Sequence, residues 1–184
     1  VGLRSPRRPE EYQAILRSAL EETDRIARLV EGLLLLSRSD AGVLRMDRRP
    51  VGLKNLIEEV IQQVQPLAES HSVKLRTGPV ELAQILGDPD HLRRLLLNLV
   101  DNGIKYTQSG GSVEISLRID GKWAILQVSD TGIGIAKEDQ EELFRRFYST
   151  AAARAQGESG SGLGLAIARS IAEAHGGRIQ VESA

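Results

Sequence analysis

The stretch DPDHLRRLLLNLVDNGIKYT, residues 88–107, carries the clearest signals for fold and function in this chain. Asp88 followed by Pro89 is typical of a helix start, because the aspartate caps the first N–H groups and proline fits the first helical position. We expect this helix to end near residue 106. Its apolar side would carry Leu92, Leu96, Leu99 and Gly103. Its opposite side would carry Asn98, Asn102, Lys105 and Tyr106.

The polar side of this helix allows two interpretations. Asn98 and Asn102 are four residues apart and stack on consecutive turns, which is compatible with an ordinary solvated surface. The alternative is a site for oxygen ligands, because amide oxygens suit Mg²⁺, which prefers few protein ligands together with water and phosphates. Lys105 would then supply a point charge for a phosphate.

A second signal follows the predicted strand 122–129, where Asp130 precedes the glycines Gly132 and Gly134. Two glycines two residues apart let the backbone turn tightly and approach a ligand closely. Asp130 either caps this turn or accepts a hydrogen bond from the exocyclic amine of a base.

A third signal is the glycine cluster at positions 157, 160, 162 and 164, directly before a predicted helix at 163–175. Backbone N–H groups at a helix start bind phosphate, although flexible linkers are also rich in glycine. The spacing matches neither the P-loop nor the dinucleotide-binding fingerprint, so those two motifs are excluded.

The chain from residue 43 onward alternates helices and strands, and Asp120-Gly121 predicts an antiparallel hairpin. The pattern indicates an α+β fold with several helices on one face of a mixed sheet. Proline at position 66 should kink or shorten the end of the helix predicted at 53–69. Predicted helices cover 53–69, 89–106, 137–147 and 163–175. Predicted strands cover 73–77, 83–87, 113–119, 122–129 and 178–183.

Residues 9 to about 39 read as one long helix whose apolar positions recur at alternating spacings of four and three, interrupted by Glu22. About 30 residues make a rod of roughly 45 Å, which favours a helical bundle shared by two subunits over packing on its own domain. Gly42 would end this helix. A domain boundary is expected near residue 43, and residues 45–52 would form a linker or an edge strand.

Composition excludes several classes of protein. Of 184 residues, Lys and Arg contribute 24 and Asp and Glu 25, so the net charge of −1 argues against a dedicated nucleic-acid binder. Without cysteine, the chain has no disulfides, thiolate nucleophiles or Cys-ligated metals. No apolar run reaches the roughly 18–20 residues that span a bilayer, and no signal peptide is present. Both ends suggest a fragment of a longer protein, and the low aromatic content of 3% predicts an aliphatic core.

Four segments in order resemble the N, G1, F and G2 boxes of two-component sensor histidine kinases: NLVDNGIKYT (98–107), DTGIGI (130–135), FRRFY (144–148) and GSGLGLAIARSIAEAHGG (160–177). The resemblance covers about residues 43–184 and implies the Bergerat (GHKL) ATP-binding fold, a two-layer α/β sandwich shared with gyrase B and heat-shock chaperone ATPases. Residues 10–42 resemble the second helix of the kinase dimerisation domain, which implies a homodimer through residues 1–42.

The resemblance also implies residue roles toward ATP and Mg²⁺. Asn102 would ligate Mg²⁺ with Asn98 supporting it, while Lys105 would contact phosphate and Tyr106 would lie near the adenine. Asp130 would read the adenine amine in a pocket shaped by Gly132, Gly134 and Ile135. Phe144 and Phe147 would anchor a lid spanning about 144–160, with Arg146 and Arg154 as lid contacts to phosphate. The phosphates would be wrapped by Gly160, Ser161, Gly162, Leu163, Gly164 and Leu165.

The resemblance has departures. The usual phosphoacceptor histidine motif is absent, and His71, His91 and His175 read as structural or surface residues. A final strand is missing, and Gly103 replaces the more usual alanine.

The expected activity is phosphoryl transfer from Mg·ATP to a histidine on a dimerisation domain, and then to a response regulator receiver domain. The expected location is the cytoplasmic portion of a membrane-anchored sensor, with any membrane contact outside this chain.

Two alternatives stay open. One is a nucleotide-binding module, either a pseudokinase or an anti-sigma factor kinase that phosphorylates serine, which the long N-terminal helix disfavours. The other is a dimeric scaffold without a ligand. ATP hydrolysis is disfavoured, because Asn98 stands where gyrase-type ATPases carry a water-activating glutamate.

Overall fold

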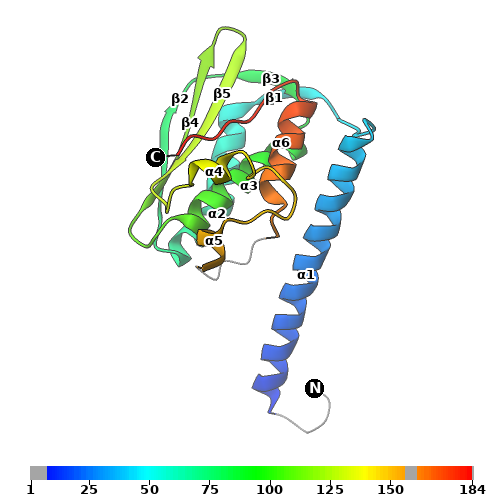
Figure 1. Ribbon diagram of the computed structural model, residues 1–184, viewed down its shortest axis with the longest axis vertical. Helices are drawn as coiled ribbons and strands as arrows, with labels where there is room; N and C mark the ends of the chain where they lie inside the picture. Colours follow the sequence, from blue (N-terminus) through cyan, green and yellow to red (C-terminus); the bar gives the residue numbers. More distant parts are fainter. Residues whose placement is uncertain (1–7, 156–160, 184) are drawn as a thin grey trace.

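A computed structural model describes residues 8–155 and 161–183 of the chain (Figure 1). The long helix expected near the N-terminus is present, and the segment from residue 49 onward mixes helices and strands. In chain order the elements are α1 (Pro9–Asp40), β1 (Arg49–Gly52), α2 (Leu53–Ser70), β2 (Lys74–Val80), β3 (Gln84–Gly87), α3 (Pro89–Tyr106), β4 (Ser112–Asp120), β5 (Trp123–Asp130), α4 (Lys137–Gln140), α5 (Ala151–Ala155) and α6 (Gly164–Ala174).

The strands form two sheets instead of the single mixed sheet that was expected. β2 pairs with β4 in parallel, and β4 pairs with β5 in the predicted antiparallel hairpin, from Val113 opposite Asp130 to Asp120 opposite Trp123. β3 pairs with β1 in a separate two-stranded sheet. The mixture of parallel and antiparallel pairs is confirmed, and the division arises because β3 pairs with the connector strand β1 instead of β2.

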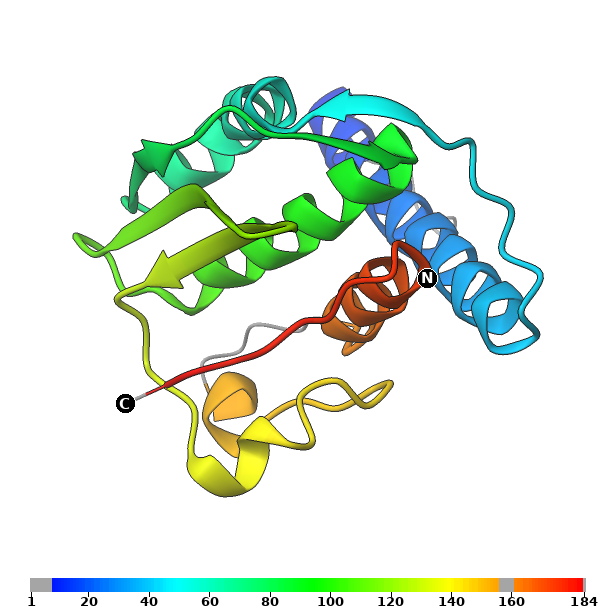
Figure 2. The ribbon, with the colours of Figure 1, turned by 90° about the horizontal axis from the view of Figure 1, so that it is seen from above.

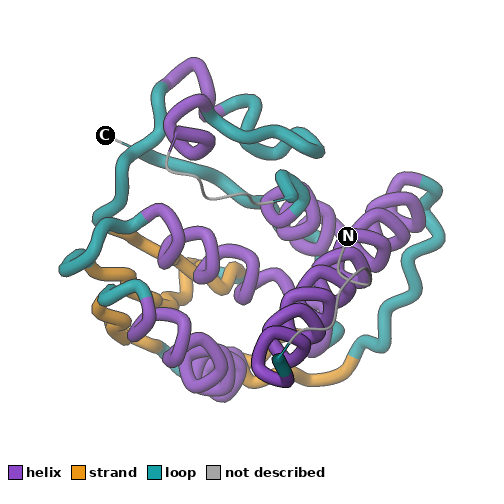
Figure 3. The backbone as a smooth tube through the Cα atoms, turned by 90° about the horizontal axis from the view of Figure 1, so that it is seen from below, coloured by secondary structure: helices purple, strands orange, loops and turns teal. Residues whose placement is uncertain are grey.

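Helices α2 and α3 cover one face of the three-stranded sheet, as the sequence predicts (Figures 2 and 3). The apolar faces of both helices meet the inward side chains of β4 in one aliphatic cluster. Leu96, Val100 and Ile104 of α3 and Val113 and Ile115 of β4 are fully buried there. This packing fixes the direction of α3, so that its polar face is turned away from the sheet.

Helix α1 projects from the rest of the molecule as a rod, and only its C-terminal part packs on the domain (Figure 1). There Leu35 and Leu36 are buried against Leu163 and Ile167 of α6. A Cβ added to Gly32 would lie 2.9 Å from Cδ1 of Ile167, so the absence of a side chain at Gly32 allows this close packing. Among the helices described, none is long and apolar enough to cross a membrane.

Packing on the chain's own domain therefore describes part of α1, and the bundle shared by two subunits stays a prediction. The end near the domain packs intramolecularly. Beyond this contact, an apolar stripe stays exposed and needs another partner. Its members are Ile15, Leu16, Leu20, Ile26, Val30, Leu33 and Leu34.

The predicted strand at 178–183 is absent, which corrects the sequence interpretation. Residues 177–183 form no backbone ladder with any described strand. The alternation is nevertheless visible, since Ile179 and Val181 are half-buried while Arg178 and Gln180 are exposed. A period of two predicts which side chains face inward, but a strand also needs a neighbour for its hydrogen bonds.

The predicted helix at 137–147 is also wrong beyond its first turn. α4 ends at Gln140, and Phe147 has φ of 62°, which a helix cannot contain. The short helix α5 was missed, although Thr150 accepts a hydrogen bond from the N–H of Ala153 and an alanine-rich run follows it.

Pro66 does not shorten α2, which continues to Ser70. Val64 and Ala68, on either side of the proline, are buried in the core. Their burial, and the hydrogen bond from Val73 N–H to the Ala68 carbonyl, offset the hydrogen bond that proline cannot make.

Asp88 joins the connector to the start of α3. Its Oδ1 accepts from the N–H groups of Asp90 and His91, and its Oδ2 accepts from the N–H of Asp47 and lies 3.0 Å from His91 Nδ1. Burial alone would raise the pKa of this carboxyl, but the hydrogen bonds from His91 and Asp47 lower it to about 2. The predicted helix cap is confirmed, and it also holds the connector that follows α1.

Replacing Asp88 with Asn keeps the cap but removes the charge, so it should make unfolding about 2 kcal/mol easier at pH 7. Because the folded-state pKa is depressed, this contribution is present above the unfolded pKa near 4. It should fade as the pH falls through about 2. Urea unfolding of both proteins between pH 7 and pH 2 measures the difference. Asp24→Asn on the exposed part of α1 is the control, and a difference that does not change with pH would contradict the assignment.

Candidate functional site

The polar face of α3 is brought against the first residue of α6. A Cβ added to Gly164 would lie 3.4 Å from Oδ1 of Asn98 and 3.9 Å from Nδ2 of Asn102. The glycine-rich segment and the stacked amides, 60 residues apart in sequence, are therefore direct neighbours. The N-terminus of α6, with its free N–H groups, begins at this point.

The side chain of Asn98 is incompletely satisfied. Its Nδ2 is buried and has no hydrogen-bond partner in the part of the chain that the structure describes. Buried polar groups are normally paired, so this amide, which lies beside Gly164, keeps a donor that a polar ligand could satisfy. No group of three or more His, Cys, Asp or Glu side chains that could hold a metal occurs in residues 8–155 and 161–183. A metal here would depend on few protein ligands, as Mg²⁺ does.

The Asp130 turn packs on the C-terminal end of the same helix. Asp130 Oδ1 accepts a hydrogen bond of 2.9 Å from Gly132 N–H, and Ile133 N–H donates to the Tyr106 carbonyl at 3.2 Å. A Cβ on Gly132 would lie 2.5 Å from the carbonyl oxygen of Tyr106, so only glycine fits. Asp130 thus caps the turn, as one interpretation proposed. Its exposed Oδ2 has no partner among the described residues, so it can still accept a hydrogen bond from a ligand.

The three signals of the sequence meet along α3. Gly164 adjoins Asn98 and Asn102, the Cβ of Asp130 lies 3.7 Å from a Cβ placed on Gly103, and Gly132 adjoins Tyr106. These contacts occupy consecutive turns of one helix. The arrangement can present amide oxygens, a carboxylate and backbone N–H groups to a single ligand.

The segment after the Asp130 turn lies on the side of α3 opposite α2 (Figure 2). Phe147 N–H donates to the Gly162 carbonyl at 2.8 Å, and a Cβ on Gly162 would lie 2.6 Å from the Phe147 backbone. The guanidinium of Arg169 lies over the Phe144 ring at 5.7 Å. The two predicted lid anchors therefore attach this segment to the start of α6. Gly157 and Gly160 lie outside the described residues.

Two of the three cations expected to bind phosphate, Lys105 and Arg146, have carboxylate partners in this structure. Lys105 Nζ lies 2.6 Å from Asp101 Oδ2. Arg146 Nη2 lies 2.6 and 2.5 Å from the two carboxylate oxygens of Asp40, at the end of α1. Arg154 lies on α5 with an exposed side chain. The sequence analysis missed Asp101 and Asp40, although the spacing of four between Asp101 and Lys105 was a usable signal.

Two further predicted residues, Gly134 and Ile135, lie at a cavity. They line its volume of about 410 Å³ together with Lys137 and Asp139 of α4 and Thr150. Asn98, Asn102 and Asp130 do not line this cavity, so it is separate from the contacts along α3.

Residues 161–165 contribute unequally. Ser161 Oγ accepts from Leu163 N–H at 3.3 Å, and Leu165 is half-buried in α6. The side chain of Leu163 is only 1% exposed and packs with Leu35 and Leu36 in the α1–α6 cluster, so any contact of Leu163 with a ligand would come from its backbone.

The histidines lie outside the α3 site. His175 Nε2 accepts from Asp88 N–H at 3.0 Å, and its Nδ1 lies 2.8 Å from the Ile171 carbonyl. Burial lowers the pKa of His175, and His91 is bound to Asp88. His71 lies in the turn after α2 and contacts the Leu67 carbonyl. These positions fit structural roles.

The chain resembles known proteins along most of its length. Residues 87–184 match the family described as Histidine kinase-, DNA gyrase B-, and HSP90-like ATPase. Sensor protein CutS of Streptomyces coelicolor is 39% identical over 183 residues, which cover 99% of this chain and 44% of CutS. The chain therefore spans less than half the length of this curated relative.

Solved structures agree with the fold. Acinetobacter baumannii histidine kinase AdeS superposes with a TM-score of 0.75 and 25% identity, over 94% of this chain and 77% of that chain. Full-length ShkA, solved in complex with AMPPNP, superposes with a TM-score of 0.76 and 29% identity, over 90% of this chain and 34% of that chain.

Replacing Gly162 with Ala should destabilise the attachment between Phe147 and α6. The change places a methyl group 2.6 Å from the Phe147 backbone at a φ of 64°, and strain of this kind costs about 1–3 kcal/mol. Chemical unfolding measures the loss. Gly42→Ala is the matched control, because Gly42 has a φ of 67° but no neighbour within 4 Å. Equal losses in the two variants would show that the contact with Phe147 contributes nothing.

Proposed function

The chain belongs to the histidine kinase-, DNA gyrase B- and HSP90-like ATPase family, and from this premise we propose that it is the ATP-binding catalytic portion of a sensor histidine kinase. In this role it transfers the γ-phosphoryl group of Mg·ATP to a histidine on a dimerisation domain. The acceptor is none of His71, His91 and His175.

The observation that carries this proposal is the convergence of three segments on α3. Gly164 touches Asn98 and Asn102, and the turn of Asp130 and Gly132 docks at Tyr106. Amides, a carboxylate and free backbone N–H groups are the donors and acceptors that a purine triphosphate needs. Supporting evidence comes from ShkA, a structural neighbour solved with an ATP analogue.

The residues would act by positioning and by neutralising charge, as in phosphoryl transfer generally. Asp130 Oδ2 would accept the adenine amine, while Oδ1 keeps the turn closed on Gly132. The N–H groups at the start of α6 would face the phosphates. Lys105 would exchange Asp101 for a phosphate oxygen. Asn98 carries an amide, which cannot remove a proton from water, and this supports transfer to an acceptor over hydrolysis.

The donor set fits Mg²⁺, because Asn102 offers one neutral oxygen ligand and the phosphates and water would supply the rest. When bound, the ion would neutralise charge on the phosphates. Asn102 would hold the ion. Asn98, one turn earlier on α3, would support the site with its unpaired amide.

The proposal extends to partners and location. The exposed apolar stripe of α1 supports a homodimer through this helix, since a helical bundle would bury it. The phosphorylated histidine would pass its phosphoryl group to a response regulator receiver domain. The chain would form the cytoplasmic portion of a membrane-anchored sensor, with any membrane contact made outside it.

Asn102→Asp tests the proposal. The added negative charge beside the phosphates should lower phosphoryl transfer to a supplied histidine-bearing dimerisation domain by about 100-fold or more. Transfer is measured with labelled ATP, and nucleotide binding is measured with a fluorescent ADP analogue with and without Mg²⁺. Asn55→Asp, on the exposed start of α2, is the matched control. Undiminished transfer by Asn102→Asp would refute its role, and absence of any nucleotide binding by the unaltered chain would favour a scaffold.

Asp130→Asn tests base recognition separately. Asn keeps an oxygen that accepts from Gly132 N–H, but it replaces Oδ2 with an amide group that cannot accept the adenine amine. ATP affinity should fall by roughly 10-fold to 100-fold, and the preference for ATP over GTP should shrink. Competition binding with both nucleotides measures this. Asp120→Asn at the far end of β4 should leave both values unchanged. A preserved preference in Asp130→Asn would remove Asp130 from base recognition.

A further inference from the structure

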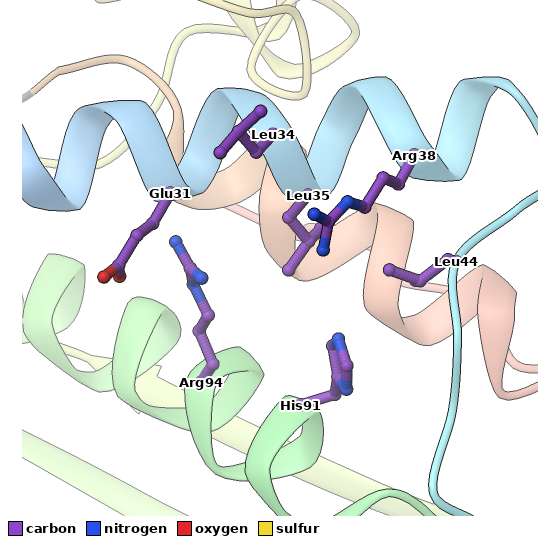
Figure 4. A pocket seen from close by; sticks show the side chains of 7 residues that line it. All are labelled: Glu31, Leu34, Leu35, Arg38, Leu44, His91 and Arg94. Atoms are coloured by element: carbon purple, nitrogen blue, oxygen red, sulfur yellow. The ribbon is translucent and has the colours of Figure 1, made fainter.

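A second cavity lies between α1 and α3, away from the convergence of segments described above. Its volume is about 230 Å³. Leucines from α1 and from the connector form its apolar wall, and charged side chains of both helices reach into it (Figure 4). The lining residues are Glu31, Leu34, Leu35, Arg38, Leu44, His91 and Arg94.

Two arginines enter this cavity from opposite helices, Arg38 from α1 and Arg94 from α3 (Figure 4). Neither has an ion pair or a side-chain hydrogen bond with any residue in the described ranges. The neighbouring Arg93, in contrast, is bound to Glu59 and Asp90. Glu59 and Asp90 are therefore already used by another arginine.

The position of Arg94 depends on α1. Its Nη2 would lie 3.6 Å from a Cβ on Gly32, the same glycine that admits Ile167. Arg94 is only partly exposed, so its charge is partly removed from water without a bound counter-charge. An unpaired guanidinium in this situation is unfavourable unless an anion joins it.

The other charges of the cavity do not balance the two arginines. Glu31 is the one acid that lines the cavity. His91 Nδ1 lies 3.0 Å from Asp88 Oδ2, and the Asp88 carboxylate is occupied by the N–H groups of Asp47, Asp90 and His91. One negative charge would neutralise the site, next to a wall of three leucines.

We propose that this cavity binds a small amphiphilic oxyanion, with a carboxylate or phosphate-monoester head between Arg38 and Arg94 and an apolar body against Leu34, Leu35 and Leu44. Such a ligand would join α1 to α3. The inference does not rest on the proposed function, because it uses none of the residues assigned to ATP.

Phenyl phosphate is a suitable probe, titrated calorimetrically into the whole chain without nucleotide. Benzoate, inorganic phosphate and benzyl alcohol are the comparison ligands. Phenyl phosphate or benzoate should bind at one site and raise the Tm, and which of the two binds more tightly identifies the head group. Inorganic phosphate should bind more weakly, and benzyl alcohol should not bind.

Variants of the lining residues should change the affinity in opposite directions. Arg38→Gln and Arg94→Gln should each weaken binding by about tenfold or more, since each removes a charge-assisted hydrogen bond. Glu31→Gln should tighten binding, because it removes the one repulsive charge. Arg28→Gln, an exposed residue of α1 outside the cavity, should bind as the unaltered chain does.

The Tm without ligand would show whether an arginine variant folds poorly. Even then the test stays decisive, because Glu31→Gln should change the affinity in the opposite direction. The proposal is overturned if no probe binds saturably, or if the affinity is unchanged in both Arg38→Gln and Arg94→Gln. It is also overturned if Asn102→Asp abolishes binding of the probe, since the probe would then occupy the ATP site.

Discussion

The close approach of bare backbone to helix α3 is the constraint on which the rest of the structure depends. Gly132 stands where any side chain would collide with the backbone of Tyr106, and Gly164 lies beside α3, where an added Cβ would be in ordinary contact with Asn98 and Asn102. These contacts place the start of α6 and the end of β5 on consecutive turns of one helix. The core beneath α3, built from aliphatic side chains of α2 and β4, holds that helix in a fixed direction.

Two cations near the candidate site have carboxylate partners. Lys105 is held by Asp101, and Arg146 is held by Asp40. All four side chains are about a third exposed or more, and pairs of this kind contribute about 0–1 kcal/mol. Exchanging either carboxylate for a phosphate therefore costs little. The pairs keep long side chains ordered near the place where a polyanion would arrive.

Most of the helices and four of the strands could be predicted from the sequence, because α2, α3 and α6 have strong apolar periodicity and α3 also begins at the Asp88 cap. It predicted a candidate site, because amides four residues apart and glycines before a helix are local patterns, and the structure brings these two patterns side by side. It failed where the outcome depends on distant partners. The segment 178–183 alternates but pairs with none of the strands described, and the helix predicted to reach residue 147 stops short of it, where Phe147 has a positive φ and bonds to Gly162.

The same limit applies to the site. Nothing local in the sequence indicates that Arg146 reaches Asp40 across 106 positions, or that Leu163 faces α1 while Gly164 faces Asn98. The apolar spacing of α1 predicted a seam correctly, but the division of that seam between α6 and the exposed stripe depends on the tertiary packing at Gly32.

The adjacency of Leu163 and Gly164 limits how freely this domain can be recombined with other proteins. Leu163 packs against α1, and Gly164, the next residue, lies against the polar face of α3. A shift of either contact would therefore move the other. A chimera that joins residues 43–184 to a foreign helix would have to carry over Gly32, Leu35 and Leu36. Without them the graft would shift Gly164 relative to Asn98 and Asn102, even with those three residues unchanged.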